Sequence, residues 1–349
     1  MAWGTPSRER RVLKAGHSSI AVTLPKPWAE AMNLRPGDLI VFDQNDDGTL
    51  YLKPAPLPGA VAEVVPFLVQ ARSFDTPGVL ERLVVGAYRV GHDSIEIRTD
   101  VPLAPDRLEE LQETARGLLG VSIVAQEPTR VVLQNFIDPS KYGLPQLVQR
   151  MKMILVAFLE EMEEVVQRKT RSRRMNALEE EANKVLALLV RQLFLASRDW
   201  SLARRIGSPD PRQLLEWRVV VHALEELADL YGGSLASLNE EAPTLSATTA
   251  RGLRAFLPEV KAELKTVVDA LMHPSLDRAC EAYNTSARLA GHVATPGERR
   301  NGHGHAKRPT GGLGTHLLER GAGCLSLLAE IAIDRAVASG TDTILVEAA

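Results

Sequence analysis

The chain has 349 residues, of which 45% are hydrophobic and 24% are charged, and its formal net charge at pH 7 is -3. This length allows two or three domains with cores of their own, and the composition excludes a disordered tail or a uniformly basic nucleic-acid coat. No signal segment is visible at the start, and the apolar run at 324–333 is shorter than the roughly 18 residues that span a bilayer, so we expect a cytoplasmic protein without membrane insertion.

Residues 8–54 predict a small β domain. The expected elements are an alternating strand over 20–24, a turn at Pro25 and Pro27, a short helix over Trp28–Leu34, and strands over 39–43 and 50–53 joined by a hairpin turn at Asp47-Gly48. Because so small a hairpin unit is marginal in water, it needs a partner surface. A second copy of the chain is the simplest one.

The same region is basic. The candidate DNA-binding residues are Arg8, Arg10, Arg11, Lys14 and Lys26. With Arg35, and against Glu9 and Glu30, they give the first 35 residues a local charge of about +4. Phosphate contacts by such residues give affinity that depends on salt and little on base sequence.

The segment VLKAGHSSIAVTLPKPWAEAMNLRPGDLIVFDQNDDGTLYLKP, residues 12–54, resembles the SpoVT-AbrB or MazE swapped-hairpin domain. The positions that carry the resemblance are Gly16, Ser18, Leu24-Pro25, Leu34 and Gly37-Asp38. It implies a homodimer through an interleaved swapped-hairpin head, which in many members binds DNA. Ala29-Glu30 stand where some DNA-binding members have arginines, so a purely dimerising role stays open.

A proline-rich linker, Pro54–Gly59, separates this head from a predicted α+β domain at residues 61–138. The expected elements are a helix over Gly78–Val90, a strand over Ser94–Arg98, a helix over Asp106–Leu119, and a hairpin of Val121–Ala125 with Arg130–Phe136. Its charged residues have the pattern of solvated helix faces.

Residues 142–340 predict an all-α bundle. Six helices are expected, over Gly143–Arg168, Ser172–Arg204, Arg212–Asn239, Leu245–Met272, Leu276–Ala294 and Leu313–Ser339, with Pro258 kinking or breaking the fourth. The octets HALEELAD (222–229) and HLLERGAG (316–323) lie in the third and sixth helices. Their spacing implies two three-helix repeats, over 142–240 and 243–340.

The third helix carries a possible metal site. Glu225 and Asp229 lie one turn apart on one face, beside a buried stripe, and the second helix repeats this spacing with Glu179 and Asn183. Carboxylates spaced in this way suit iron, manganese, magnesium or zinc. The same pattern is also typical of the solvent-exposed face of an ordinary amphipathic helix. The spacing alone does not distinguish a metal site from such a face.

The bundle resembles the PhoU family in LEEEAN (178–183), ALEELAD (223–229) and LLERGAG (317–323). The resemblance implies that Glu179, Glu225 and Asp229 hold an iron or zinc cluster in the first repeat. The second repeat departs from the pattern, because Ala290 and Gly323 replace two expected acids and only Glu319 is kept. At most one cluster is therefore expected.

No Walker loop, dinucleotide fingerprint or Ser/His/Asp set is present, so we expect no enzyme. The two resemblances together imply a phosphate-responsive regulator that modulates phosphate uptake or phosphate-dependent transcription. Its partners would be DNA and a phosphate transporter or sensor kinase. The alternatives are a metal-binding adaptor without DNA binding and an antitoxin-type AbrB or MazE regulator. His303 and His305, in the glycine-rich loop 297–314, suit a flexible linker better than a metal site.

Overall fold

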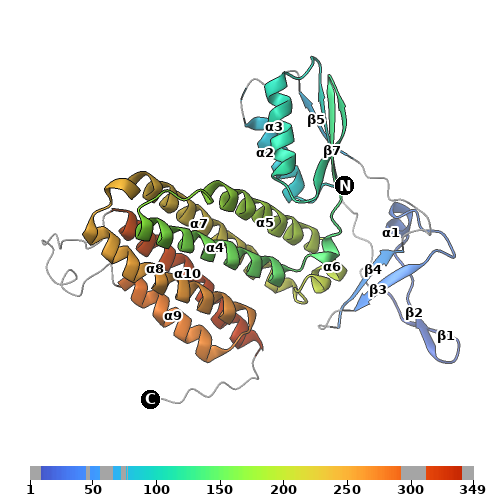
Figure 1. The fold of residues 1–349 in the computed structure, drawn as a ribbon. Coiled ribbons are helices and arrows are strands. Elements are labelled where there is room, and N and C mark those ends of the chain that lie inside the picture. The colour runs from blue at the N-terminus through green and yellow to red at the C-terminus, as the bar shows by residue number, and fades with distance from the viewer. Residues whose placement is uncertain are drawn as a thin grey trace, which may run out of the picture. The chain divides into compact units, whose positions relative to one another are not determined.

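The computed structural model describes residues 9–44, 48–55, 66–71, 76, 78–291 and 312–339. The chain forms two compact units, Met1–Glu63 and Val64–Ala349, and each is described by itself below (Figure 1). None of the described helices is long and apolar enough to cross a bilayer.

The N-terminal unit contains antiparallel hairpins flanking a short helix. Its elements are β1 (Leu13–Ala15), β2 (Ser19–Ala21), α1 (Lys26–Ala31), β3 (Ile40–Gln44) and β4 (Leu50–Pro54). β1 pairs with β2 and β3 pairs with β4, which confirms the predicted hairpin over 39–53. Gly16 and Gly48 adopt positive φ angles of 77° and 81° in the turns, where glycine is free of steric strain. Asp47 lies outside the described residues.

Three predicted boundaries in this unit are wrong. Pro25 and Pro27 begin α1 rather than forming a turn, because Pro25 is the extended N-cap and a proline in the first helical turn gives up an N–H that has no partner there. The helix ends at Ala31, before Asn33 adopts a left-handed φ of 52°. Pro54 belongs to β4, opposite Ile40, rather than to the linker.

The first part of the second unit is a mixed sheet with two helices. Its elements are β5 (Phe67–Ala71), α2 (Val79–Arg89), β6 (Ser94–Thr99), α3 (Pro105–Arg116), β7 (Val121–Glu127) and β8 (Arg130–Asn135). The described strands are ordered β5-β6-β8-β7, with β5 parallel to β6 and the other pairs antiparallel. Both helices cover one face of the sheet, where Leu80 and Leu111 share a core with Ile97 and Leu133. We did not predict β5, because a short apolar run beside Pro66 has no readable period.

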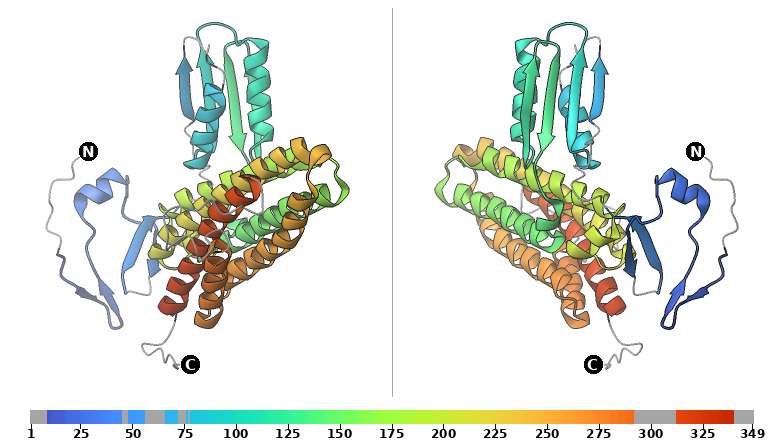
Figure 2. Two further views of the ribbon diagram at one scale, coloured as in Figure 1. Left: turned by 90° about the vertical axis from the view of Figure 1, so that its left-hand side faces the viewer. Right: turned by 90° about the vertical axis from the view of Figure 1, so that its right-hand side faces the viewer.

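The remainder is a helical bundle (Figure 2). Its helices are α4 (Leu144–Arg168), α5 (Met175–Ala196), α6 (Trp200–Arg205), α7 (Pro211–Glu241), α8 (Ala247–Met272), α9 (Leu276–Gly291) and α10 (Gly312–Ser339), with 3-10 turns at Pro139–Lys141 and Ala242–Thr244. α4, α5 and α7 contact one another, as do α8, α9 and α10, while α4 also contacts α8 and α7 contacts α10. This grouping accords with two three-helix units, and the duplication itself stays a prediction.

Two predictions about the bundle helices concern where the helices are interrupted. The helix expected over Ser172–Arg204 stops at Ala196, and Asp199 starts α6 by accepting hydrogen bonds from the backbone N–H groups of Ser201 and Leu202. At Pro258, where a kink or a break was expected, α8 continues without a break, and the kink stays a prediction. The flanking Leu257 and Val260 are buried in the core, and this packing outweighs the proline's cost of about 3 kcal/mol.

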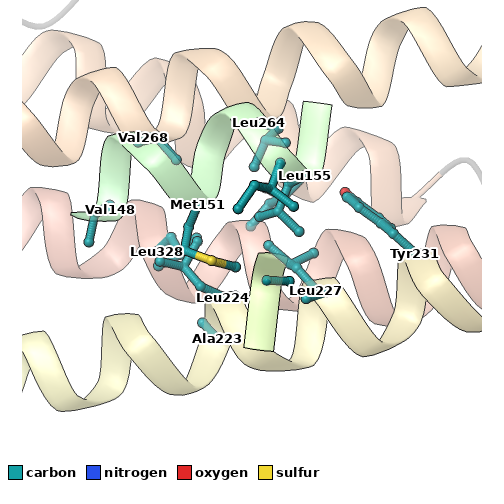
Figure 3. Packing of buried hydrophobic residues seen from close by; sticks show 14 of the residues in the cluster. Val148, Met151, Leu155, Ala223, Leu224, Leu227, Tyr231, Leu264, Val268 and Leu328 are labelled. Atoms are coloured by element: carbon teal, nitrogen blue, oxygen red, sulfur yellow. The ribbon is translucent and has the colours of Figure 1, made fainter. Parts of the chain in front are cut away.

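The core of the bundle is formed by the apolar stripes of its helices. Figure 3 shows Met151 and Leu155 of α4 beside Leu224 and Leu227 of α7, with Leu328 of α10 close by. All of these side chains are buried. The predicted core stripe of α7 is confirmed, because Val221, Leu224, Ala228, Tyr231, Leu235 and Leu238 are all buried.

A buried arginine joins the sheet-containing part to the bundle. Arg191 of α5 is 2% exposed, and its Nη1 donates to the carbonyls of Tyr88, at 2.7 Å, and His92, at 2.9 Å. Its Nη2 pairs with Asp93. Burial lowers the pKa of Arg191, while Asp93 acts in the opposite direction. Ala187, one turn earlier on α5, belongs to the core of the sheet.

Candidate functional site

The predicted DNA-binding residues that the structure describes lie at the surface of the N-terminal unit. Arg10 and Arg11 precede β1, Lys14 lies within it opposite Ile20, and all three are exposed. Lys26 opens α1 and pairs with Glu30 at 3.6 Å. Both of those side chains are more than half exposed, so the pair is weak and leaves Lys26 accessible. Arg8 lies outside the described residues.

The apolar residues of this unit are not covered. Ile20 is 77% exposed, Leu39 73% and Phe42 62%, and no described side chain of residues 9–55 is buried. The hairpins therefore have strand pairing but no core. Covering one large aliphatic side chain contributes about 1.5–3 kcal/mol, so a second apolar surface would stabilise this unit strongly.

Residues 13–59 match a family model described as "Antidote-toxin recognition MazE, bacterial antitoxin". The head is therefore similar to MazE-type domains. The match spans β1 to β4, which confirms the resemblance seen in the sequence of this region. No curated protein and no solved structure matches the chain.

The match bears on the uncovered apolar residues. AbrB-like and MazE-like domains commonly dimerise and bind DNA, and pairing with a second copy would give these residues an apolar surface to pack against. The arginines and lysine near β1 would then be present twice in one head. Such an arrangement would suit contacts with DNA phosphates.

The predicted metal residues lie on neighbouring helices of the bundle. Glu225 and Asp229 are one turn apart on α7. Glu179 of α5 lies beside Gly232 of α7, since a Cβ built on Gly232 would be 3.0 Å from Oε1 of Glu179. Partial burial raises the pKa of Asp229, and the nearby Glu225 and Glu226 raise it further. The helices therefore place three carboxylates along one side of α7.

This acidic stripe, Glu179, Glu225 and Asp229, has an arginine beside it. Nη2 of Arg89, on α2, lies 3.7 Å from Oε1 of Glu225. Among the residues that the structure describes, no group of three or more His, Cys, Asp or Glu side chains could hold a metal ion. Arg89 thus offsets one of the three carboxylates of the stripe, and the iron or zinc centre stays a prediction.

Asn183, the fourth position of the predicted signature, lines a different feature. It lies in a groove of 760 Å³ between α2, α3 and α5, with the acids Glu81, Glu110, Glu113 and Glu180 and the bases Arg89, Arg116 and Lys184. Glu110 is used structurally there, because it accepts from the backbone N–H groups of Gly78 and Glu81 at the start of α2. Glu179 and Asn183 are one helical turn apart on α5 but have different surroundings, because Glu179 lies beside Gly232 of α7 and Asn183 lines this groove.

In the second repeat, the structure describes Gly323, which is exposed on α10. The side chains of Ala290 and Glu319 and the loop residues His303 and His305 lie outside the described residues.

Three side-chain arrangements were not predicted from the sequence: the pairing of Arg89 with Glu225, the buried Arg191, and the stacked pair of Trp217 and Arg335 described below. A single arginine inside the apolar run LALLVRQLFLA marks Arg191 as a buried, partnered charge, and this signal was readable. The other two meet their partners across helices, which spacing along the chain does not reveal.

Proposed function

We propose that the chain is a cytoplasmic, non-enzymatic regulator whose MazE-type heads pair into one DNA-binding unit. The supporting observation is that residues 13–59 match the MazE family while no described side chain of the head is buried. A fold that buries nothing on its own gains most from a second copy.

DNA binding in this proposal rests on Arg10, Arg11 and Lys14. All three are exposed and lie within five residues at the start of the first hairpin. Two chains would present six such cations. Each phosphate neutralised releases counterions, so the logarithm of the binding constant falls with the logarithm of salt with a slope of about -0.9 per contact, or roughly -5 for six contacts.

Fluorescence anisotropy with duplex DNA at several salt concentrations tests this role. The Arg10→Ala, Arg11→Ala, Lys14→Ala variant is expected to lose most binding and to bring the slope close to zero. A matched control replaces the exposed bundle arginines Arg173, Arg251 and Arg278 by alanine and keeps the slope. Equal slopes in both variants, or no binding by the wild type at low salt, would contradict the DNA role.

We infer in addition that the regulator is phosphate-responsive and PhoU-like. Support comes from the resemblance of residues 178–183, 223–229 and 317–323 and from the two groups of three mutually contacting helices. In this proposal the bundle senses a phosphate-linked state through a phosphate transporter or sensor kinase and modulates uptake or transcription. The iron or zinc cluster on the acidic stripe belongs to the same proposal.

A cross-linking pull-down from phosphate-starved and phosphate-replete cells tests the phosphate role. The full-length chain is expected to capture a transporter or kinase component in one state and to release it in the other. An identical partner set in both states would remove the phosphate role without affecting the DNA role.

The antitoxin alternative is favoured by the description of the matched family. An antitoxin of this class would neutralise a toxin through a segment that follows the head, whereas here the head is followed by a sheet-containing part and a helical bundle. Depletion of the chain separates the two roles. Growth arrest that is relieved by deleting a neighbouring toxin gene would favour the antitoxin, and altered phosphate uptake without arrest would favour the regulator.

A further inference from the structure

A groove of 830 Å³ lies at one end of the bundle. The N-terminal ends of α4 and α7 meet the C-terminal ends of α8 and α10 around it, with lining residues from 145–153, 210–217, 271–274 and 335–339. Its volume falls within the range of about 300–1,000 Å³ that is typical of small-molecule sites. It shares no lining residue with the acidic stripe or with the head.

The floor of this end groove is a stacked pair of side chains. Trp217 of α7 is 3% exposed, and the guanidinium carbon of Arg335 of α10 lies 4.0 Å from the centre of a Trp217 ring. Arg335 Nε donates to Glu216 Oε2 at 3.0 Å, and Nη1 donates to the carbonyl of Leu271 at 3.3 Å. These bonds fix the plane of the guanidinium against the indole.

Two buried donors of this pair are left without acceptors. Trp217 Nε1 and Arg335 Nη2 have no hydrogen-bond partner among the described residues, and the Arg335 side chain is only 10% exposed. Buried polar atoms are nearly always paired, so an unpaired one needs an explanation. Because both atoms are donors, the group that would satisfy them is an acceptor.

The rest of the groove is part apolar and part charged. Met153, which is 60% exposed, contributes to the apolar wall together with Leu271 and Met272. Each of its three arginines has an acidic partner: Arg212 pairs with Asp210 at 2.6 Å, Arg150 with Glu181, and Arg335 with Glu216 at 3.0 Å. Among the described residues of the lining, Arg335 is distinguished by a buried Nη2 that has no acceptor.

We propose that this end groove binds a small organic anion, with an apolar body against Met153 and Met272 and one carboxylate or phosphate group at Trp217 Nε1 and Arg335. Both donor atoms lie beneath the groove surface, so binding includes a rearrangement of the groove wall. Inorganic phosphate would leave the apolar wall uncovered. The site is therefore distinct from any direct sensing of phosphate.

Isothermal titration calorimetry of the full-length chain with 2-naphthoate tests this proposal. The uncharged 2-naphthamide and inorganic phosphate serve as comparison probes. Naphthoate is expected to bind at least about fivefold more tightly than the amide, since only the anion forms charged hydrogen bonds at the floor, and phosphate is not expected to displace it. Two variants probe the site: Trp217→Phe keeps a ring without the N–H, and Met153→Glu places a negative charge on the exposed wall.

Both variants are expected to weaken naphthoate binding by at least about fivefold. Leu215→Glu is the matched control, because Leu215 is 75% exposed on α7 and does not line the groove. Unfolding curves in urea establish that each variant is folded. Equal affinity in all four proteins, equal binding of the amide, or no naphthoate binding by the wild type would overturn the proposal, whatever the outcome of the DNA and phosphate experiments.

Discussion

The buried Arg191 is expected to contribute much of the free energy that holds the sheet-containing part against the bundle. Replacing it by methionine keeps a long apolar stem and removes the guanidinium. The change breaks the bonds to the carbonyls of Tyr88 and His92 and the ion pair with Asp93. α2 and β6 would then lose their fixed attachment to α5.

The magnitude follows from the exposure of each partner. A hydrogen bond from a charged donor is worth about 1.5–3 kcal/mol, and two such bonds are lost. Asp93 is 51% exposed, so its ion pair is screened by water and adds about 0.5 kcal/mol or less. Relief of the desolvation of Arg191 offsets part of this loss, so we expect a destabilisation of about 3 kcal/mol.

Hydrogen exchange measured by mass spectrometry reads this effect locally. Amide protection in α2 and β6 is expected to fall by about two orders of magnitude in Arg191→Met. Protection in α8 should stay unchanged, since it makes no contact with Arg191. Arg198→Met is the control, because Arg198 is exposed and its loss should change stability by less than about 0.5 kcal/mol. A loss below about 1 kcal/mol in Arg191→Met would refute the reasoning.

Three further predictions concern other parts of the chain. Glu263 is buried in α8, accepts from Ser286 Oγ at 2.7 Å, and has a pKa raised by burial. The wild type therefore loses stability as pH rises through that raised pKa, so Glu263→Gln should have the higher urea midpoint at neutral pH and lose this advantage below about pH 4. If the acidic stripe holds iron or zinc, Glu225→Ala with Asp229→Ala should lower the metal content measured by mass spectrometry after chelator-free purification, and equal content would remove the site. Ile20→Asp should weaken head pairing by about tenfold or more in sedimentation velocity, and an unchanged dimer would exclude Ile20 from the interface.

Periodicity predicted the long helices well and their interruptions poorly. In α7 the 3.6-residue period correctly placed Val221 and Leu224 inside and His222 and Asp229 outside. The break between α5 and α6 escaped prediction because the apolar pattern continues past Ala196, although Asp199 is a typical N-cap residue. β5 escaped because its hydrogen bonds go to a strand that follows a whole helix later.

The candidate sites were less predictable than the helices that carry them. Spacing placed Glu225 and Asp229 on one face of α7, but the arginine beside Glu225 comes from α2, far away in the chain. Trp217 and Arg335 likewise meet only because α7 and α10 pack together. Pairings of this kind depend on tertiary contacts, which a single sequence does not encode in any local pattern.

The length of α7 has a mechanical consequence. It is one uninterrupted helix of 31 residues that carries Trp217 near its start and Asp229 in its middle, about 18 Å further along the axis. Because the two groups share one continuous helix, a shift of α7 along its axis would move both of them together. A displacement of the indole would therefore be transmitted mechanically to the carboxylates, and through Arg89 to α2, without any relay of small side-chain movements between them.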